Sequence, residues 1–169
     1  RGPQLTYINE TERPLTLLAS RVQFQSTLQL DFSTSKPASD KATFLGGNIG
    51  YAATWHYRFL GTPTGTLPHD SRSRFTLMAG PQLTTDIGGL YNTRNGNNPA
   101  QAYLSANLAA SVLAGHPSRL RRMPVSLREQ LDVPLIGAMF TPAYGQSYYE
   151  IFALESSDHN IRAIHPFNA

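Results

Sequence analysis

Hydrophobic and polar residues alternate along most of this chain with a period of two, the pattern of a β-strand whose two faces differ. The clearest case is "LGGNIGYAATWHYRF" (45–59), where Ile49 and Trp55 fall on one face and Asn48 and His56 on the other. The same alternation recurs at 20–33, 73–88, 100–114 and 124–138, and "LTYINET" near the start is a further candidate. The pattern predicts an all-β fold of six antiparallel strands joined in chain order.

The alternating segments are long. They exceed the usual strand of about 5–6 residues and reach the ~9–11 residues of a strand that crosses a membrane. The connections "STSKPASDK", "GTPTGTLPHDS" and "AGHPSRLRRMP" contain the residues that favour turns. Helical periodicity is absent over three turns, although "SLREQL" fits one short helix as well as a strand.

Alternation does not by itself say which face points inward, because a membrane barrel reverses the arrangement of a soluble one. The polar faces here hold Gln, Asn, Thr, Ser and Gly, and neither lysine lies in a predicted strand. Aromatic residues gather at strand ends on the apolar face, as in an interfacial girdle; they are Trp55, Tyr57, Phe59 and Phe75. We therefore predict an antiparallel up-and-down membrane β-barrel. The alternative is a soluble β-barrel that binds an apolar ligand.

The chain has 169 residues, which suits a single β-barrel domain spanning 1–169. Six strands would leave an open sheet edge, whose backbone groups find no partner in lipid. Two more strands would give eight, the smallest common membrane barrel, with an interior filled by side chains. We expect eight strands in the full-length protein, with the last strands absent from this chain or supplied by partners.

Composition excludes several other classes of protein. The absence of cysteine rules out disulfide scaffolds and thiolate metal sites, and the five histidines show no paired ligand spacing. We predict no metal and no cofactor. The net charge of +3 comes with twelve arginines but only Lys36 and Lys41. Because the arginines are scattered and no nucleic-acid module is present, we predict no nucleic-acid partner.

Arginines gather at one end of the predicted sheet. Antiparallel order brings the connections near 61–75 and 114–124 to that end, together with Arg13 and Arg58. Such a ring can bind the phosphate head groups of outer-membrane lipid, including lipopolysaccharide. The predicted contact residues are Arg72, Arg74, Arg119, Arg121 and Arg122. The alternative is a solvated rim without a specific ligand.

The opposite end carries the densest polar segment, "GGLYNTRNGNNPAQAYL" (88–104), and the aromatic segment within 137–160. Asparagine and glycine favour a turn there, and Arg94 needs carbonyls or a carboxylate such as Asp86 or Asp132. We expect a periplasmic rim or plug held by hydrogen bonds. Its predicted members are Asp86, Asn92, Arg94, Asn95, Asn97, Asn98, Tyr144, Tyr148, Tyr149 and Glu150.

Two motifs about fifty residues apart, "GGLYNTRNGNNPA" and "FTPAYGQSYYEIF", resemble a family of uncharacterised outer-membrane proteins from Bacteroidota, the domain-of-unknown-function family 3316. The resemblance covers most of the chain. It implies a small β-barrel in the outer membrane, with further strands after the position of Ala169. It implies no activity.

The sequence thus favours a non-enzymatic barrel of the bacterial outer membrane, with a structural, lipid-contacting or complex-forming role that includes other outer-membrane proteins as partners. A lipid-modifying hydrolase of the same membrane, using His159 or His165, is the alternative. Ser156, Asp158 and His159 supply the residue types of a catalytic triad, but adjacent side chains on a strand point apart. No nucleophile-elbow motif is present.

Overall fold

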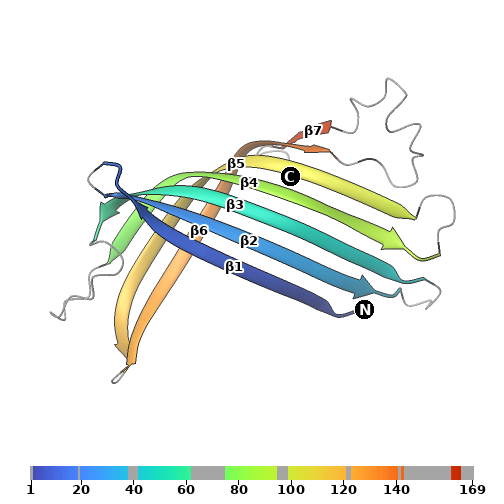
Figure 1. Cartoon of the computed structure of the whole chain (residues 1–169), viewed down its shortest axis with the longest axis horizontal. Coiled ribbons are helices and arrows are strands. Elements are labelled where there is room, and N and C mark those ends of the chain that lie inside the picture. Colours follow the sequence, from blue (N-terminus) through green and yellow to red (C-terminus); the bar gives the residue numbers. More distant parts are fainter. Residues whose placement is uncertain are drawn as a thin grey trace.

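In the computed structural model, the chain forms one antiparallel sheet whose strands follow each other in sequence order, β1 to β7 (Figure 1). The structure describes residues 2–18, 20–37, 42–61, 75–94, 99–120, 123–140, 142 and 161–164. The strands are β1 (Gln4–Leu15), β2 (Val22–Ser35), β3 (Phe44–Leu60), β4 (Thr76–Asn92), β5 (Ala100–Leu120), β6 (Met123–Phe140) and the short β7 (Ile161–Ile164). The predicted all-β, up-and-down arrangement of the six long strands is confirmed.

One predicted connection is wrong. "AGHPSRLRRMP" is mostly strand, because Ala114–Leu120 of β5 pair residue by residue with Met123–Glu129 of β6. Continuous ladder partners outweigh the turn preference of its glycine and prolines. The segment "SLREQL" lies within β6, so the helical alternative for it is also wrong.

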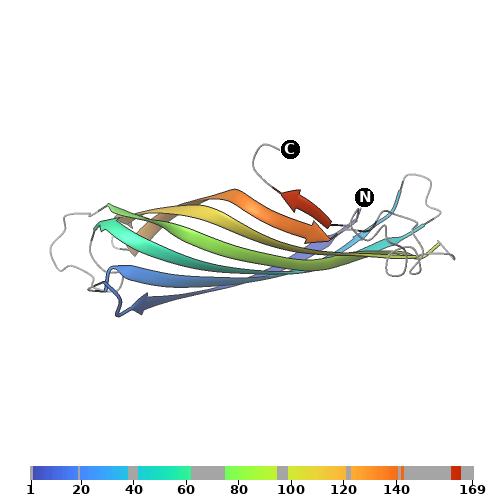
Figure 2. The ribbon, with the colours of Figure 1, turned by 90° about the horizontal axis from the view of Figure 1, so that it is seen from above.

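The sheet is open. Among the residues that the structure describes, β1 pairs along one edge with β2, and β7 pairs along one edge with β6 over four residues. No backbone ladder between β1 and β6 or β7 is found in the described ranges. The predicted closed barrel is therefore not reached in this structure, and the observed form is a curved sheet (Figure 2).

The two faces of the sheet differ sharply. Polar side chains on one face are buried, with His56 0% and Ser111 1% exposed. Apolar side chains on the other face are open, with Leu83 46% and Ile87 59% exposed. Gln25 of β2 reaches Gln130 of β6 across the intervening strands, which shows that the sheet curls around its polar face. We call this the concave face and the apolar one the convex face.

A bulge interrupts the ladder between β5 and β6. Leu108 faces Ile136, but the next residue, Ala109, faces Pro134, so Leu135 is an extra residue in β6. Proline has no backbone N–H to donate to the ladder, and bulges are where such residues are accommodated. Within the described ranges, no helix has the length and hydrophobicity needed to cross a membrane.

Candidate functional site

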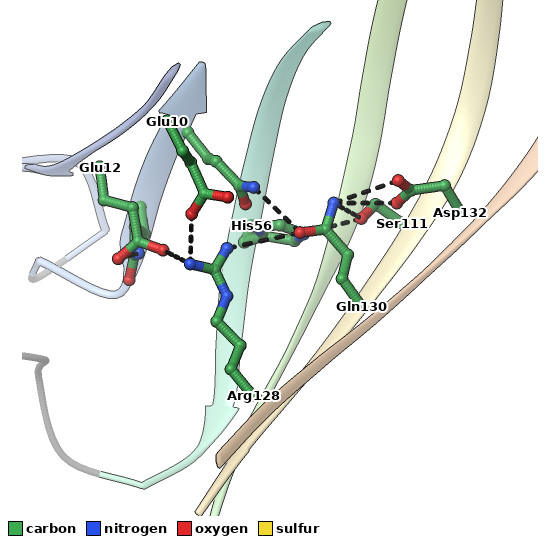
Figure 3. Close-up of polar contacts among 9 residues, drawn as sticks. Glu10, Glu12, His56, Ser111, Arg128, Gln130 and Asp132 are labelled. Carbon is green, nitrogen blue, oxygen red and sulfur yellow. Dashed lines mark hydrogen bonds and ion pairs between the residues drawn. The ribbon is translucent and has the colours of Figure 1, made fainter. Parts of the chain in front are cut away.

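A polar network covers the concave face and draws side chains from all six long strands; Figure 3 shows the part that runs from Glu10 and Glu12 to Asp132. Alternation explains its composition, since every second residue of each strand points to this face. The network consists of Glu10 and Glu12 of β1, Gln25 of β2, Thr54 and His56 of β3, Gln82 of β4, Ser111 of β5, and Arg128, Gln130 and Asp132 of β6.

Arg128 links the sixth strand of the sheet back to the first. Its guanidinium forms ion pairs with the carboxylates of Glu10 and Glu12, and Figure 3 shows it lying between them. The three side chains are each only partly buried, so solvent screens the attraction and the pairing stabilises modestly. Its structural effect is larger, because it links β6 to β1 where no ladder does.

Gln130 is the centre of the network. Its Oε1 accepts a hydrogen bond from Nε2 of Gln25 at 2.9 Å. Its own Nε2 donates to Oγ of Ser111 at 3.3 Å and to Oδ1 of Asp132 at 3.0 Å. Oδ2 of Asp132 accepts a further bond from Gln82 at 3.1 Å. One amide therefore connects β2, β5 and β6, and a carboxylate extends the connection to β4.

Two glycines of β4 lie where side chains of β3 and β5 bond across that strand. His56 of β3 and Ser111 of β5 share a hydrogen bond of 2.9 Å, and Gly80 lies in β4 between these strands. A Cβ on Gly80 would come within 1.8 Å of the Trp55 carbonyl oxygen, so β3 and β4 approach here in a way that only glycine permits.

The second crossing lies nearer the other end. The hydroxyl of Tyr103 in β5 donates to Oδ1 of Asn48 in β3 at 3.0 Å. A Cβ on Gly88 of β4 would lie 2.3 Å from the Tyr103 ring. The ring therefore occupies the space that a side chain at position 88 would need.

The pairing of His56 with Ser111 does not have the features of a catalytic centre. Both side chains are fully buried, so a substrate cannot reach the hydroxyl. Among the described residues, Nδ1 of His56 has no hydrogen-bond partner, and Asp132 bonds to Gln82 and Gln130 instead. No described carboxylate therefore orients this histidine as a triad requires. Within the described part of the chain, no cluster of three metal-ligating side chains is found.

The arginines predicted to contact lipid fall partly outside the described residues. Arg119 lies in β5, whereas Arg72, Arg74, Arg121 and Arg122 are in segments that the structure does not describe. Arg13 is exposed at the same end of the sheet. Arg58, grouped with them from the sequence, differs, because it points to the concave face and is only 6% exposed.

The structure describes only some members of the predicted rim. Oδ1 of Asn92 accepts a bond from the backbone N–H of Arg94 at 3.1 Å, an Asx-type turn. Gln101 donates to the Pro142 carbonyl at 3.1 Å, so the two predicted segments begin at the same end of the sheet, as expected. Asp86 accepts from Ser105 rather than sharing a described bond with Arg94.

The other predicted members of the rim lie outside the described residues. They are Asn95, Asn97, Asn98, Tyr144, Tyr148, Tyr149 and Glu150. The histidines proposed for a hydrolase, His159 and His165, also lie there.

The predicted girdle residues lie on the convex face. Trp55 is 40% exposed, Phe59 and Phe75 are more exposed, and Tyr57 is half-buried. The rings of Phe24 and Trp55 are 5.4 Å apart, and those of Tyr57 and Phe59 are 5.1 Å apart. A soluble barrel with an apolar core would have buried Trp55, so this exposure speaks against that alternative.

Sequence reasoning placed the polar faces correctly but did not identify the network as a site. The available signal was charge inside predicted strands. Arg128 and Asp132 oppose Glu129 in the alternation of β6, and Glu10 and Glu12 have equal parity in β1. Inward charges of opposite sign on the first and sixth strands suggest a contact between those strands if the sheet curls.

Comparison with known proteins gives one result. No curated protein and no solved structure matches the chain. A family model described as "Protein of unknown function (DUF3316)" matches residues 1–169, as the paired motifs suggested. This protein belongs to the DUF3316 family.

Proposed function

We propose that this protein is a non-enzymatic β-barrel of the bacterial outer membrane, with a structural, lipid-contacting or complex-forming role. The observation that carries the proposal is the sidedness of the sheet. Its concave face buries glutamine, serine, histidine and arginine, while its convex face exposes large apolar side chains over the length of the six long strands. A soluble protein rarely exposes an apolar surface of this extent, whereas lipid requires it.

The aromatic residues of the convex face support the proposal by their spacing. Phe24 and Phe32 lie eight residues apart on β2, which is about 26 Å along the strand and about 21 Å along the normal of a membrane if the strand tilts by about 35°. Apolar bands of membrane barrels are about 25 Å tall between two girdles. Phe24, Trp55, Tyr57, Phe59 and Phe75 form one band, and Tyr7, Phe32 and Tyr91 the other, while Tyr51 lies between the two bands opposite Leu28.

The stagger of the strands also fits a barrel. Following the ladder partners from strand to strand, Gln130 of β6 leads through Leu113, Met78 and Arg58 to Arg21, just before β2. In space, however, Gln130 bonds to Gln25, which lies four residues further along β2 than Arg21. The stagger is therefore four residues over the four steps from β2 to β6, or one residue for each strand. That stagger corresponds to a strand tilt of about 35°. Strands of closed barrels tilt by about 35–45°.

The bond between Gln25 and Gln130 also bears on barrel size. Two glutamine side chains of about 5 Å each, joined by one hydrogen bond, span at most about 13 Å, the value for fully extended side chains. With that tilt, the diameter is about 15 Å for eight strands and about 19 Å for ten. The span is closer to eight, and β2 and β6 would then lie opposite each other. We infer that two complete strands, of which β7 begins the first, fill the space between β6 and β1.

The proposed role follows from the filled interior. The network places bonded side chains across the middle of the concave face, so the barrel resembles those whose lumen is packed rather than open. Its outer surface then carries the function, through contact with lipid or with other outer-membrane proteins. The outer edge of β1 and the long edge of β6 beyond β7 are the places where completing strands would pair.

We propose that the arginine-rich end, with Arg13 and Arg119 among the described residues, lies outermost and contacts the phosphates of outer-membrane lipid, including lipopolysaccharide. The rim near Asn92 would then be periplasmic. We place the protein in the outer membrane of the Bacteroidota, as the resemblance of its two motifs suggests.

Membrane extraction and gel migration test the proposal. The protein expressed in its bacterial host should remain in the outer-membrane fraction after high-salt and carbonate washes, and should be released only by detergent. Unheated samples should migrate differently from boiled ones, since a closed barrel resists the detergent of the gel. A monodisperse protein obtained without detergent would refute the proposal.

A further inference from the structure

Glu129 is a charged residue within the apolar surface of the convex face. It is exposed in β6 opposite the methyl group of Ala114. Its neighbours on the same face of β6 are Leu127 and Leu131, which are 60% and 65% exposed, so apolar surface continues on both sides of the carboxylate. A charge on the lipid-facing side of a membrane barrel is costly, and charged side chains in membrane-spanning segments are mostly found paired.

Arg13 is a cation on the same face. It is exposed in β1, opposite Phe24 of the first aromatic band. No ion pair or hydrogen bond of the Glu129 or Arg13 side chain is found in the described ranges of the chain. One charge of each sign therefore lies unpaired on the surface that the proposed function places in lipid.

The concave network gives the relative depth of the two charges. Gln130 bonds to Gln25 across the concave face, and Gln25 is the ladder partner of Glu12, so Gln130 and Glu12 lie at about the same depth. Arg13 and Glu129 are each one residue nearer the arginine-rich end, because β1 runs toward that end and β6 runs away from it. Their depths therefore agree to within about one residue, or about 3 Å.

The two charges are too far apart to pair within one copy of the chain. With the two strands inferred above between β6 and β1, Glu129 and Arg13 are three strand spacings apart, about 15–18 Å around the barrel. Lipid is a poor partner for Glu129 at this end, because the phosphates proposed to lie there have the same sign of charge as a carboxylate. Arg13 has five N–H donors, so it can pair with a carboxylate and still contact a phosphate.

We propose that the convex face around Glu129 binds a second copy of this chain, through an ion pair between Glu129 of one copy and Arg13 of the next. Both copies have the same orientation in a membrane, so the two charges meet at one depth. The contact places β6 of one copy beside β1 of its neighbour, a head-to-tail arrangement that continues into a ring or a row. The exposed leucines beside Glu129 exclude water from the ion pair and strengthen it. This inference rests on the membrane location proposed above.

The first measurement is cross-linking in the outer membrane. The chain has no cysteine, so Glu129→Cys in one tagged copy and Arg13→Cys in a differently tagged copy introduce one thiol each. A short bis-maleimide should join the two copies when they are expressed together. Leu83→Cys is the matched control for Glu129→Cys, because Leu83 is also exposed on the convex face but lies in the middle of β4. It should give no product with Arg13→Cys.

Charge reversal tests the ion pair itself. Donor-labelled and acceptor-labelled copies of the protein, mixed in lipid vesicles, report self-association by Förster transfer. Glu129→Arg alone and Arg13→Glu alone should each weaken association about tenfold, because each variant puts like charges together at every contact. An equimolar mixture of the two variants should restore association, because each contact in the mixture again joins a cation to an anion.

Failure of this inference differs from failure of the proposed function. A protein that is released without detergent overturns the membrane location and the inference with it. A protein that stays in the membrane, but gives no more cross-linked product than the Leu83→Cys control, overturns only the contact between copies and leaves a lipid ammonium as the cation for Glu129. If the mixed charge-reversal variants associate no better than either variant alone, the ion pair is refuted.

Discussion

His56 and Ser111 share a hydrogen bond of 2.9 Å although the whole of β4 lies between their strands. Gly80, which lies between these strands, lets the backbones of β3 and β4 approach closely, and Gly88 leaves the space for the Tyr103 ring that reaches Asn48. The concave network thus depends on glycine at two positions of β4 as well as on the polar side chains of the other strands.

We expect Gly80→Ala to destabilise the protein by about 2 kcal/mol or more, because the new Cβ would meet the Trp55 carbonyl oxygen at 1.8 Å and force β3 and β4 apart. Gly47→Ala is the matched control. Its Cβ would meet one backbone oxygen at 3.9 Å, so its effect should stay within about 0.5 kcal/mol. Chemical unfolding in detergent measures both. Equal costs for the two would show that the close approach of β3 and β4 does not require glycine at position 80.

Gly88→Ala should also destabilise, because its Cβ would lie 2.3 Å from the Tyr103 ring, and we expect a cost of about 1–3 kcal/mol. The same substitution in a Tyr103→Ser background should cost much less, since the obstructing ring is gone. A double-mutant cycle in the same unfolding assay measures the coupling. Strictly additive costs would show that the ring is not the cause.

Arg128→Gln should lower stability by about 1 kcal/mol, because it leaves Glu10 and Glu12 without their cation but all three side chains are partly exposed. Arg128→Glu should cost more, since it adds a third carboxylate. The deficit of the Glu variant should shrink in 1 M salt, where the Debye length is about 3 Å. Unfolding midpoints at low and high salt provide the measurement. A deficit that does not change with salt would mean that the contact is not electrostatic.

On the convex face, the cost of introducing a charged side chain should depend on how deep in the membrane the position lies. Leu83 lies in the middle of β4, next to Ala53 and Leu108, whereas Leu60 ends β3. In lipid, Leu83→Arg should cost about 2–4 kcal/mol and Leu60→Arg about 0–1 kcal/mol. Unfolding from lipid vesicles is the assay. If the two arginines cost the same, the convex face does not cross a bilayer.

The sequence predicted the strands and their faces well, because alternation is a local property and each strand carries it over many residues. Alternation along β6 puts Glu129 on the apolar side of the strand, for example, and the structure has it exposed opposite Ala114. Strand ends were harder, since Gly115 and Pro117 favour a turn and only their partners in β6 keep them in a ladder.

The candidate site could not be read in the same way. Gln25 and Gln130 are 105 residues apart, and their contact depends on how far the sheet curls and how its strands are staggered. Met78 and Leu113 are large apolar side chains buried on the polar face, where alternation alone gives no reason for them. The burial of Arg58 follows from the same curvature.

Fluorescence of Trp55 tests the membrane proposal most directly. It is the single tryptophan of the chain, it is 40% exposed on the convex face, and it belongs to one aromatic band. In vesicles of brominated phosphatidylcholine, we predict strong quenching, greatest when the bromines lie near the head groups, and little quenching by aqueous iodide. Emission that brominated lipid leaves unchanged at every depth would contradict the account.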